Sequence, residues 1–215
     1  MNVRRFDVLT RVVHWTIAAL TLVLLATGTI LYVGQLEAAV GRRAQLATIH
    51  VWCGLLLPVP LILGVVLGRA GAGLRADLHE LSWWSRGDKR WLRRSTRQQP
   101  DGKFNGGQKL ATALFGGLLL AQLLTGALMH WNQPFPDDWR TGATFVHDWA
   151  YLALVVLVLG HVGRAFQEPV LLNSMVTGKV PSAWAERERP AWADEQRTRE
   201  PEAAKSEEHM ACESE

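Results

Sequence analysis

Apolar residues along this chain are concentrated in four stretches that strongly polar segments separate. The stretches cover about residues 12–33, 49–67, 110–129 and 145–166. A helix rises 1.5 Å per residue, so about 20 apolar residues cross the roughly 30 Å of hydrocarbon in a bilayer. The pattern therefore predicts an all-α integral membrane protein with a bundle of four transmembrane helices. We expect the spans at about residues 11–33, 47–68, 108–130 and 144–167.

Lysine and arginine are distributed unevenly between the polar segments. Three arginines precede or open the first span, and a long basic segment lies between the second and third spans. These residues are Arg4, Arg5 and Arg11, and then Arg69, Arg75, Arg86, Lys89, Arg90, Arg93, Arg94, Arg97 and Lys103. The other two connections are less basic. Because cytoplasmic loops are enriched in lysine and arginine, the chain is predicted to be a multi-pass membrane protein with both termini cytoplasmic.

The polar segments suggest how the chain is organised around the spans. Residues 74–107 mix tryptophan with arginine, which suits a helix in the membrane interface, and a solvated basic loop fits the same composition. Because membrane spans flank this segment, its expected partner is anionic lipid and not nucleic acid. Residues 194–215 are almost all polar. We therefore expect one membrane domain over residues 1–193 and a disordered, charged cytoplasmic tail beyond it.

Cysteine usage and the first apolar stretch exclude several protein classes. Cys53 lies in a span and Cys212 in the tail, so no disulfide framework is expected. No C-x-x-C-H motif occurs, which excludes covalently attached haem of the c type. The first apolar stretch is long and lacks a small-residue cleavage site, so it is predicted to be an uncleaved helix and not a signal peptide.

Four histidines at the ends of predicted spans sort into two pairs by depth. His147 and His161 are fourteen residues apart, which on a helix is a rise of about 21 Å with both side chains on nearly the same face. His14 opens the first span at the cytoplasmic side, level with His161. His50 opens the second span at the outer side, level with His147. This arrangement is the one that two stacked haems with two histidine ligands each would need.

Two glycines match the histidine pattern. Gly28 lies fourteen residues after His14, at the depth of the outer pair, and Gly64 lies fourteen residues after His50, at the depth of the inner pair. A missing side chain would let the edge of a flat porphyrin approach the helix. Glycine is also common in membrane helices for packing reasons, so helix contact is the alternative role.

Acidic residues inside the spans would distinguish other roles of the histidines from haem ligation. A di-metal centre or a proton-coupled transporter would need acidic residues inside the bundle, and the predicted first three spans contain none, while Asp148 and Glu168 lie at the ends of the fourth. His130, at the outer end of the third span, is a rival ligand for the outer haem. His79 and His209 fall in polar segments and are expected to be solvated.

The segment GKFNGGQK at residues 102–109 leads into the third span at the level of the inner histidines. Asn105 and Gln108 are three residues apart, which is typical of a helix N-cap with its reciprocal partner. The same amides could line a pocket that hydrogen-bonds a quinone carbonyl beside the inner haem. Lys109 could then help to deliver protons from the cytoplasm. The two roles are compatible.

Several of these segments together resemble a known family. The R-x-x-H-W pattern at residues 11–15, GKFNGGQK, LLTGALM at residues 123–129 and the tail SMVTGKVPSAWAERERPAW are similar to the cytochrome b556 (gamma) subunits of membrane-bound formate dehydrogenases. Those subunits are related to the cytochrome b subunits of nickel–iron hydrogenases. The resemblance extends over about residues 4–193.

The resemblance implies a set of ligands and cofactors for this chain. His14 and His161 would bind an inner haem b, and His50 and His147 an outer one. Menaquinone or ubiquinone would be reduced at a site containing Asn105, Gln108 and His161.

The resemblance also implies partners. These are an iron–sulfur subunit and a molybdenum or tungsten catalytic subunit that oxidises formate outside, in an oligomer of the heterotrimer. A hydrogenase cytochrome b subunit is the alternative within this superfamily, and a haem-free anchor or transporter is the alternative outside it. The chain itself is expected to carry electron transfer and quinone reduction, and no formate chemistry.

Overall fold

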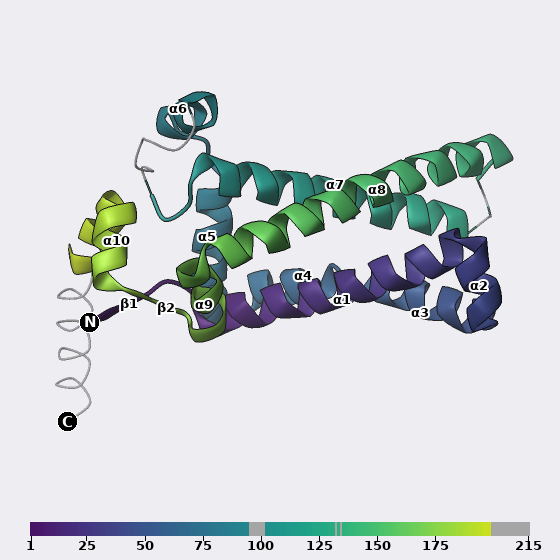
Figure 1. Cartoon of the computed structure of the whole chain (residues 1–215), viewed down its shortest axis with the longest axis horizontal. Coiled ribbons are helices and arrows are strands. Elements are labelled where there is room, and N and C mark those ends of the chain that lie inside the picture. The colour runs from purple at the N-terminus through teal and green to yellow at the C-terminus, as the bar shows by residue number, and fades with distance from the viewer. Residues whose placement is uncertain (95–101, 132, 134, 199–215) are drawn as a thin grey trace.

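The chain is almost entirely helical. The computed structural model describes residues 1–94, 102–131, 133 and 135–198. Among these residues, four helical segments are long and apolar enough to cross a membrane (Figure 1). They are α1 (Val8–Tyr32), α3 (Arg43–Leu56) together with α4 (Val59–Val66), α7 (Gly106–His130) and α8 (Asp137–Gln167). The predicted all-α fold with four spans is confirmed.

The spanning helices differ from the predicted spans in two ways. The second span is interrupted where α3 gives way to α4, because Pro58 and Pro60 remove backbone donors and do not fit a regular helix interior. The fourth helix begins at Asp137, well before the predicted residue 144. The connection after the first span contains a short helix, α2 (Gly34–Val40).

The four segments pack as two hairpins. The first consists of α1 against α3 and α4, and the second consists of α7 against α8, as Figure 1 shows along the long axis of the molecule. Few residues of the spans are buried by other protein atoms; in the most apolar window of α7 none is. Protein interiors are normally close-packed. The helices within each hairpin contact each other closely, whereas the two hairpins contact each other much less.

Both described ends of the chain lie at the same end of the bundle. Strand β1 (Asn2–Arg4) pairs antiparallel with β2 (Lys179–Pro181), with Val3 opposite Val180. Helix α9 (Pro169–Thr177) precedes β2 and α10 (Ser182–Glu188) follows it. An even number of spans between the two strands brings them to the same side of a membrane.

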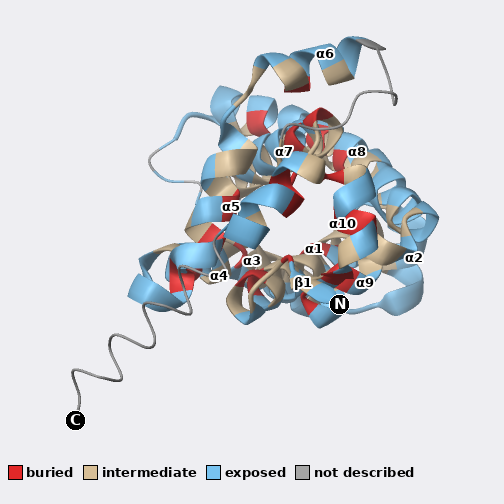
Figure 2. Cartoon of the chain, turned by 90° about the vertical axis from the view of Figure 1, so that its left-hand side faces the viewer, coloured by how far each residue is buried: buried red, intermediate tan, exposed pale blue. Residues whose placement is uncertain are grey.

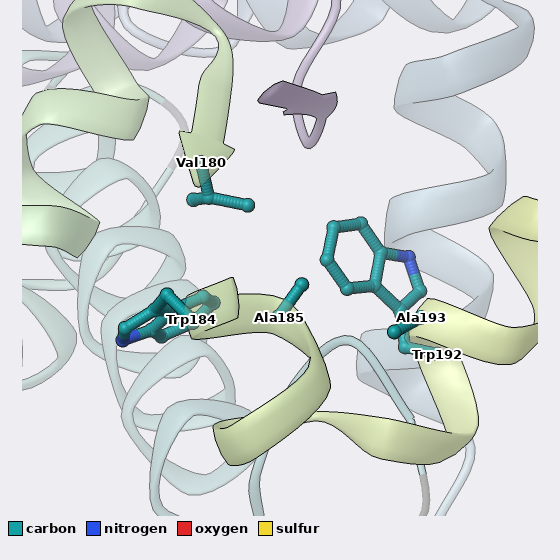
Figure 3. Packing of buried hydrophobic residues seen from close by; sticks show 5 residues of the cluster. All are labelled: Val180, Trp184, Ala185, Trp192 and Ala193. Atoms are coloured by element: carbon teal, nitrogen blue, oxygen red, sulfur yellow. The ribbon is translucent and has the colours of Figure 1, made fainter. Parts of the chain in front are cut away.

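A small hydrophobic core lies outside the spans at this end. It consists of Val180, Trp184, Ala185, Trp192 and Ala193, which Figure 3 shows around the turn between α10 and the following helix. That helix covers residues 190–198. The expectation that the chain becomes disordered beyond residue 193 is therefore wrong for residues 194–198, because buried Trp192 anchors the helix that contains it. Residues 199–215 lie outside the described part of the chain.

Arg5 ties this core to the entrance of α7. Its guanidinium lies 5.4 Å from the ring of Trp184 and 5.5 Å from that of Trp192, and it donates a hydrogen bond of 2.8 Å to the Lys103 carbonyl. Burial, and then the charge of Arg189, lower the pKa of Arg5 to about 10. The buried cation thus links the two ends of the chain through cation–π contacts.

The basic segment folds into short helices on the same end of the molecule. They are η1 (Gly68–Gly71), α5 (Ala72–Ser82) and α6 (Arg86–Arg94), and residues 95–101 lie outside the described part of the chain. Figure 2 shows α6 at the rim of this end. The side chains of Arg86, Lys89, Arg90 and Arg93 are exposed, whereas Asp88 is buried. The helical interpretation of this segment is confirmed; its predicted position in the interface stays a prediction.

Two buried ion pairs fasten these helices to the bundle. Lys109 of α7 donates to Asp88 of α6 at 2.7 Å and to the Trp83 carbonyl at 2.9 Å. Lys103 forms an ion pair with Asp77 of α5. Burial raises the pKa of the Asp77 carboxyl and lowers that of the Lys103 amine, and the attraction between the two groups partly opposes both shifts. Lys109, considered from the sequence as a proton carrier, is thus held in a structural contact.

The Lys109–Asp88 contact leads to a prediction about stability. Lys109→Met should destabilise the fold by about 3–5 kcal/mol, because it leaves the buried Asp88 carboxylate without its cation. The double variant Lys109→Met with Asp88→Asn should recover most of that loss, because the asparagine is neutral and its oxygen can still accept from the Ser85 backbone N–H. Thermal unfolding of the purified protein in detergent measures both. A double variant no more stable than the single one would contradict a dominant role for the ion pair.

Candidate functional site

The inner histidine pair joins the two hairpins near the end of the bundle that carries β1 and β2. His14 comes from α1 and His161 from α8, and their ring centroids are 6.3 Å apart. Phe115 of α7 presents its ring edge-on to His161 at 5.4 Å, and Trp15 lies against His14 at 5.4 Å. Each inner ring therefore has one aromatic side chain, other than its partner histidine, in edge contact with it.

The outer histidine pair has the same separation at the other level of α8. His50 comes from α3 and His147 from α8, and their ring centroids are again 6.3 Å apart. The structure thus brings together the two pairs that depth along the helices predicted. Each pair takes one ring from each hairpin, so the rings face one another across the interior of the bundle.

The remaining histidines lie elsewhere. The ring of His130, the rival ligand, packs against Trp131 at 5.3 Å at the end of α7. His79 is exposed on α5, as expected. His209 lies outside the described residues.

Each histidine pair offers only two nitrogen ligands from the described residues, which limits the kind of metal group that it could bind. In the described part of the chain, no three His, Cys, Asp or Glu residues gather in a way that could hold a metal ion. A bare ion such as zinc takes three or four protein ligands. Two facing imidazoles suit an iron whose other positions a porphyrin fills. Nitrogen–metal bonds of about 2 Å on both sides require ring centres roughly 6 Å apart, and the observed 6.3 Å fits.

Three residues that contact the outer pair were not predicted from the sequence. Oγ1 of Thr27 in α1 lies 2.9 Å from Nδ1 of His50, and Oγ1 of Thr125 in α7 lies 3.0 Å from Nδ1 of His147. A side chain at Gly126 would lie 3.3 Å from Cε1 of His147. The repeated Thr–Gly dipeptide at residues 27–28 and 125–126 was visible in the sequence, but nothing there linked it to the histidines.

The two glycines predicted beside the haems have different surroundings. A side chain at Gly28 would lie 3.3 Å from Cε1 of His50, so this glycine makes room for the histidine ring itself. At Gly64 a side chain would meet Leu74 of α5 at 2.6 Å and Val13 of α1 at 3.1 Å. Gly64 therefore allows α4 to approach its neighbours, which is the packing alternative.

Asn105 and Gln108 form a reciprocal cap at the start of α7. The Asn105 side chain accepts from the backbone N–H of Gln108 at 2.9 Å, and the Gln108 side chain accepts from the backbone N–H of Asn105 at 3.0 Å. The capping prediction is confirmed. Because capping uses the two amide oxygens, both amide NH2 groups remain as donors on half-buried side chains.

Gln108 of the cap lies on the same face of α7 as Phe115, the residue that contacts the inner histidine His161. Phe115, which contacts His161, is seven residues beyond Gln108. Seven residues are close to two helical turns, so both side chains point in similar directions about 10 Å apart along the axis. An apolar ligand lying along this face could reach from the amides toward the inner pair.

Paired histidines at two depths of a four-span bundle are the donor set that a membrane cytochrome of the b type requires. The chain belongs to the prokaryotic cytochrome b561 family, which it matches over residues 5–178. Family membership implies haem b and electron transfer in the bacterial inner membrane.

Similar curated proteins are cytochrome subunits of formate dehydrogenases. The cytochrome b556(Fdn) subunit of the nitrate-inducible formate dehydrogenase of Escherichia coli K12 is 29% identical over 94 residues, 42% of this chain and 43% of that protein. The E. coli K12 cytochrome b556(fdo) subunit is 32% identical over 103 residues, 45% of this chain and 47% of that protein. The aligned part thus spans less than half the length of either relative.

Proposed function

We propose that this chain is the di-haem b subunit of a formate dehydrogenase complex and carries electrons across the membrane to quinone. Two facing histidine pairs at two levels of one bundle are the observation that supports this most directly. His14 and His161 would hold the inner haem, and His50 and His147 the outer one. Bound haem would supply reversible one-electron chemistry at each level.

The two levels suit transfer across a bilayer. His147 and His161 are about 21 Å apart along α8 by helical rise, which is most of the roughly 30 Å of hydrocarbon. The level of His161 lies toward the end that carries the basic helix α6, which the positive-inside rule assigns to the cytoplasm. Electrons would therefore enter at the outer level and leave at the cytoplasmic one.

Quinone reduction is proposed at the inner level. The NH2 groups of Asn105 and Gln108 are donors for a quinone carbonyl, and Phe115 lies between them and His161 along α7. Reduction of a quinone takes two electrons and two protons, and uptake of those protons from the cytoplasm would make the transfer electrogenic. The quinone would be menaquinone or ubiquinone.

The electron donor is proposed from the relatives. Their names assign them to formate dehydrogenases. An iron–sulfur subunit would then deliver electrons from a molybdenum or tungsten subunit that oxidises formate, and heterotrimers would associate further. The exposed cations of α6 would contact anionic lipid headgroups.

A reduced-minus-oxidised spectrum of the purified protein tests the proposal. We expect a b-type α-band and two haems per chain. One haem per chain would disprove the pairing at one level, and absence of the band would disprove the electron-transfer role.

Asn105 provides a test of the quinone site. Asn105→Ala should raise the quinone KM several-fold and should also weaken the helix start by about 1 kcal/mol, because the cap is lost. Asn105→Ser keeps a capping oxygen but lacks the amide NH2, so it separates the two effects. If Asn105→Ser has the KM of the original protein while Asn105→Ala does not, the residue acts through capping alone. Steady-state quinone kinetics and haem content are the measurements.

A further inference from the structure

Each ring of the outer pair rests on a Thr–Gly dipeptide of the neighbouring helix. Residues 27–28 of α1 contact His50, and residues 125–126 of α7 contact His147. The threonine oxygens lie 2.9 Å and 3.0 Å from the ring Nδ1 atoms, and a methyl group at either glycine would lie 3.3 Å from Cε1. At both sites the threonine hydroxyl contacts ring Nδ1, and the glycine leaves space for ring Cε1.

The direction of these hydrogen bonds follows from the other partners of the hydroxyls. Thr27 Oγ1 lies 2.7 Å from the carbonyl of Val23, and Thr125 Oγ1 lies 2.6 Å from that of Ala121. A carbonyl can only accept, so each hydroxyl can give its hydrogen to the backbone and accept from a ring Nδ1–H. The backbone carbonyl of the residue three before each threonine accepts from the same ring, so the hydroxyl shares this role with the backbone. A ring with its proton on Nδ1 has its lone pair on Nε2, as an axial ligand requires.

The inner pair is held differently. His14 and His161 contact the aromatic rings of Trp15 and Phe115. Among the hydrogen bonds of the described residues, none involves either of these two imidazole rings. Both levels of the bundle therefore have a histidine pair with the same ring separation. The outer rings have threonine hydroxyls as neighbours, and the inner rings have aromatic side chains.

We propose that Thr27 and Thr125 are positioning residues that fix the outer imidazoles for iron and hold the outer haem at a lower midpoint potential than the inner haem. This inference rests on the proposed haem ligation. A ligand imidazole that donates its second N–H becomes more basic, and a more strongly donating ligand favours the oxidised iron. Hydrogen bonding to the ligands is one of the means by which a protein adjusts haem potential.

This asymmetry would give the electron path its direction. Electrons move toward the centre of higher potential, so an outer haem of lower potential passes its electron to the inner one. Two hydroxyls, one on each hairpin, would then favour transfer toward the cytoplasmic quinone site.

A redox titration tests the assignment. In a His161→Ala background, in which only the outer haem should remain, Thr27→Val with Thr125→Val removes both hydroxyls and keeps side-chain size. At a fixed ambient potential, the ratio of reduced to oxidised haem should rise about tenfold, which is about 59 mV for a one-electron couple. The Ser variants should restore the original midpoint. Thr144→Val, which removes an exposed hydroxyl on α8, should leave it unchanged.

The outcomes distinguish this proposal from the haem assignment. Haem loss in the Val variants that the Ser variants repair would also support the positioning role. An unchanged midpoint with haem bound, or equal effects of Val and Ser, would overturn it while leaving the ligand assignment intact. Retention of both haems after His161→Ala would instead contradict the ligand assignment itself.

Discussion

Replacement of His161 by alanine is expected to remove the inner haem and abolish quinone reduction. The ring of His161 faces His14 at 6.3 Å and contacts Phe115, so it is central to the inner level. The haem content should fall from two to one per chain. Quinone reduction by the complex should fall at least about 100-fold, because loss of a supporting partner alone typically costs 10–100-fold. Formate oxidation with an artificial dye should be unaffected.

His130→Ala is the matched control for this experiment. It removes a histidine of a spanning helix whose ring packs on Trp131 and not on another histidine. We expect it to keep both haems and quinone activity. If His130→Ala loses a haem and His161→Ala does not, the ligand set is wrong.

Replacement of His147 by alanine is expected to break the path at its entrance. Its ring faces His50 at 6.3 Å, and both rings lie at the level farther from the basic helix α6. The outer haem should be lost, and formate should no longer reduce the remaining haem in the intact complex. Added quinol should still reduce that haem, because the inner level with His14 and His161 is untouched.

The two routes of reduction make this result specific. A variant that has lost its fold would fail with both formate and quinol. A variant in which formate still reduces the inner haem at the original rate would show that electrons do not enter through the outer pair. Stopped-flow absorbance at the α-band, started in turn with formate and with quinol, measures both routes.

Several expectations from the sequence are completed by contacts between elements. Gly64, predicted from spacing to lie at the depth of the inner haem, packs against Leu74 of α5, an element whose position spacing does not specify. Lys109 was considered as a proton carrier, yet it bonds to Asp88 twenty-one residues away. The tail was expected to be disordered from residue 194, but Trp192 is buried in a small core against which Val3 packs. In each case the partner belongs to another element of the fold.

The pattern of residues along the chain was sufficient for the number of spans, the reciprocal cap at Asn105 and the sorting of four histidines by depth. Bilayer thickness and helical rise constrain each span separately, so position along a span is position across the membrane. Only the tertiary structure decided which side chains support the rings, including Thr27 beside His50 and Thr125 beside His147. Those contacts depend on how each helix is rotated toward its neighbours, and packing between helices determines that rotation.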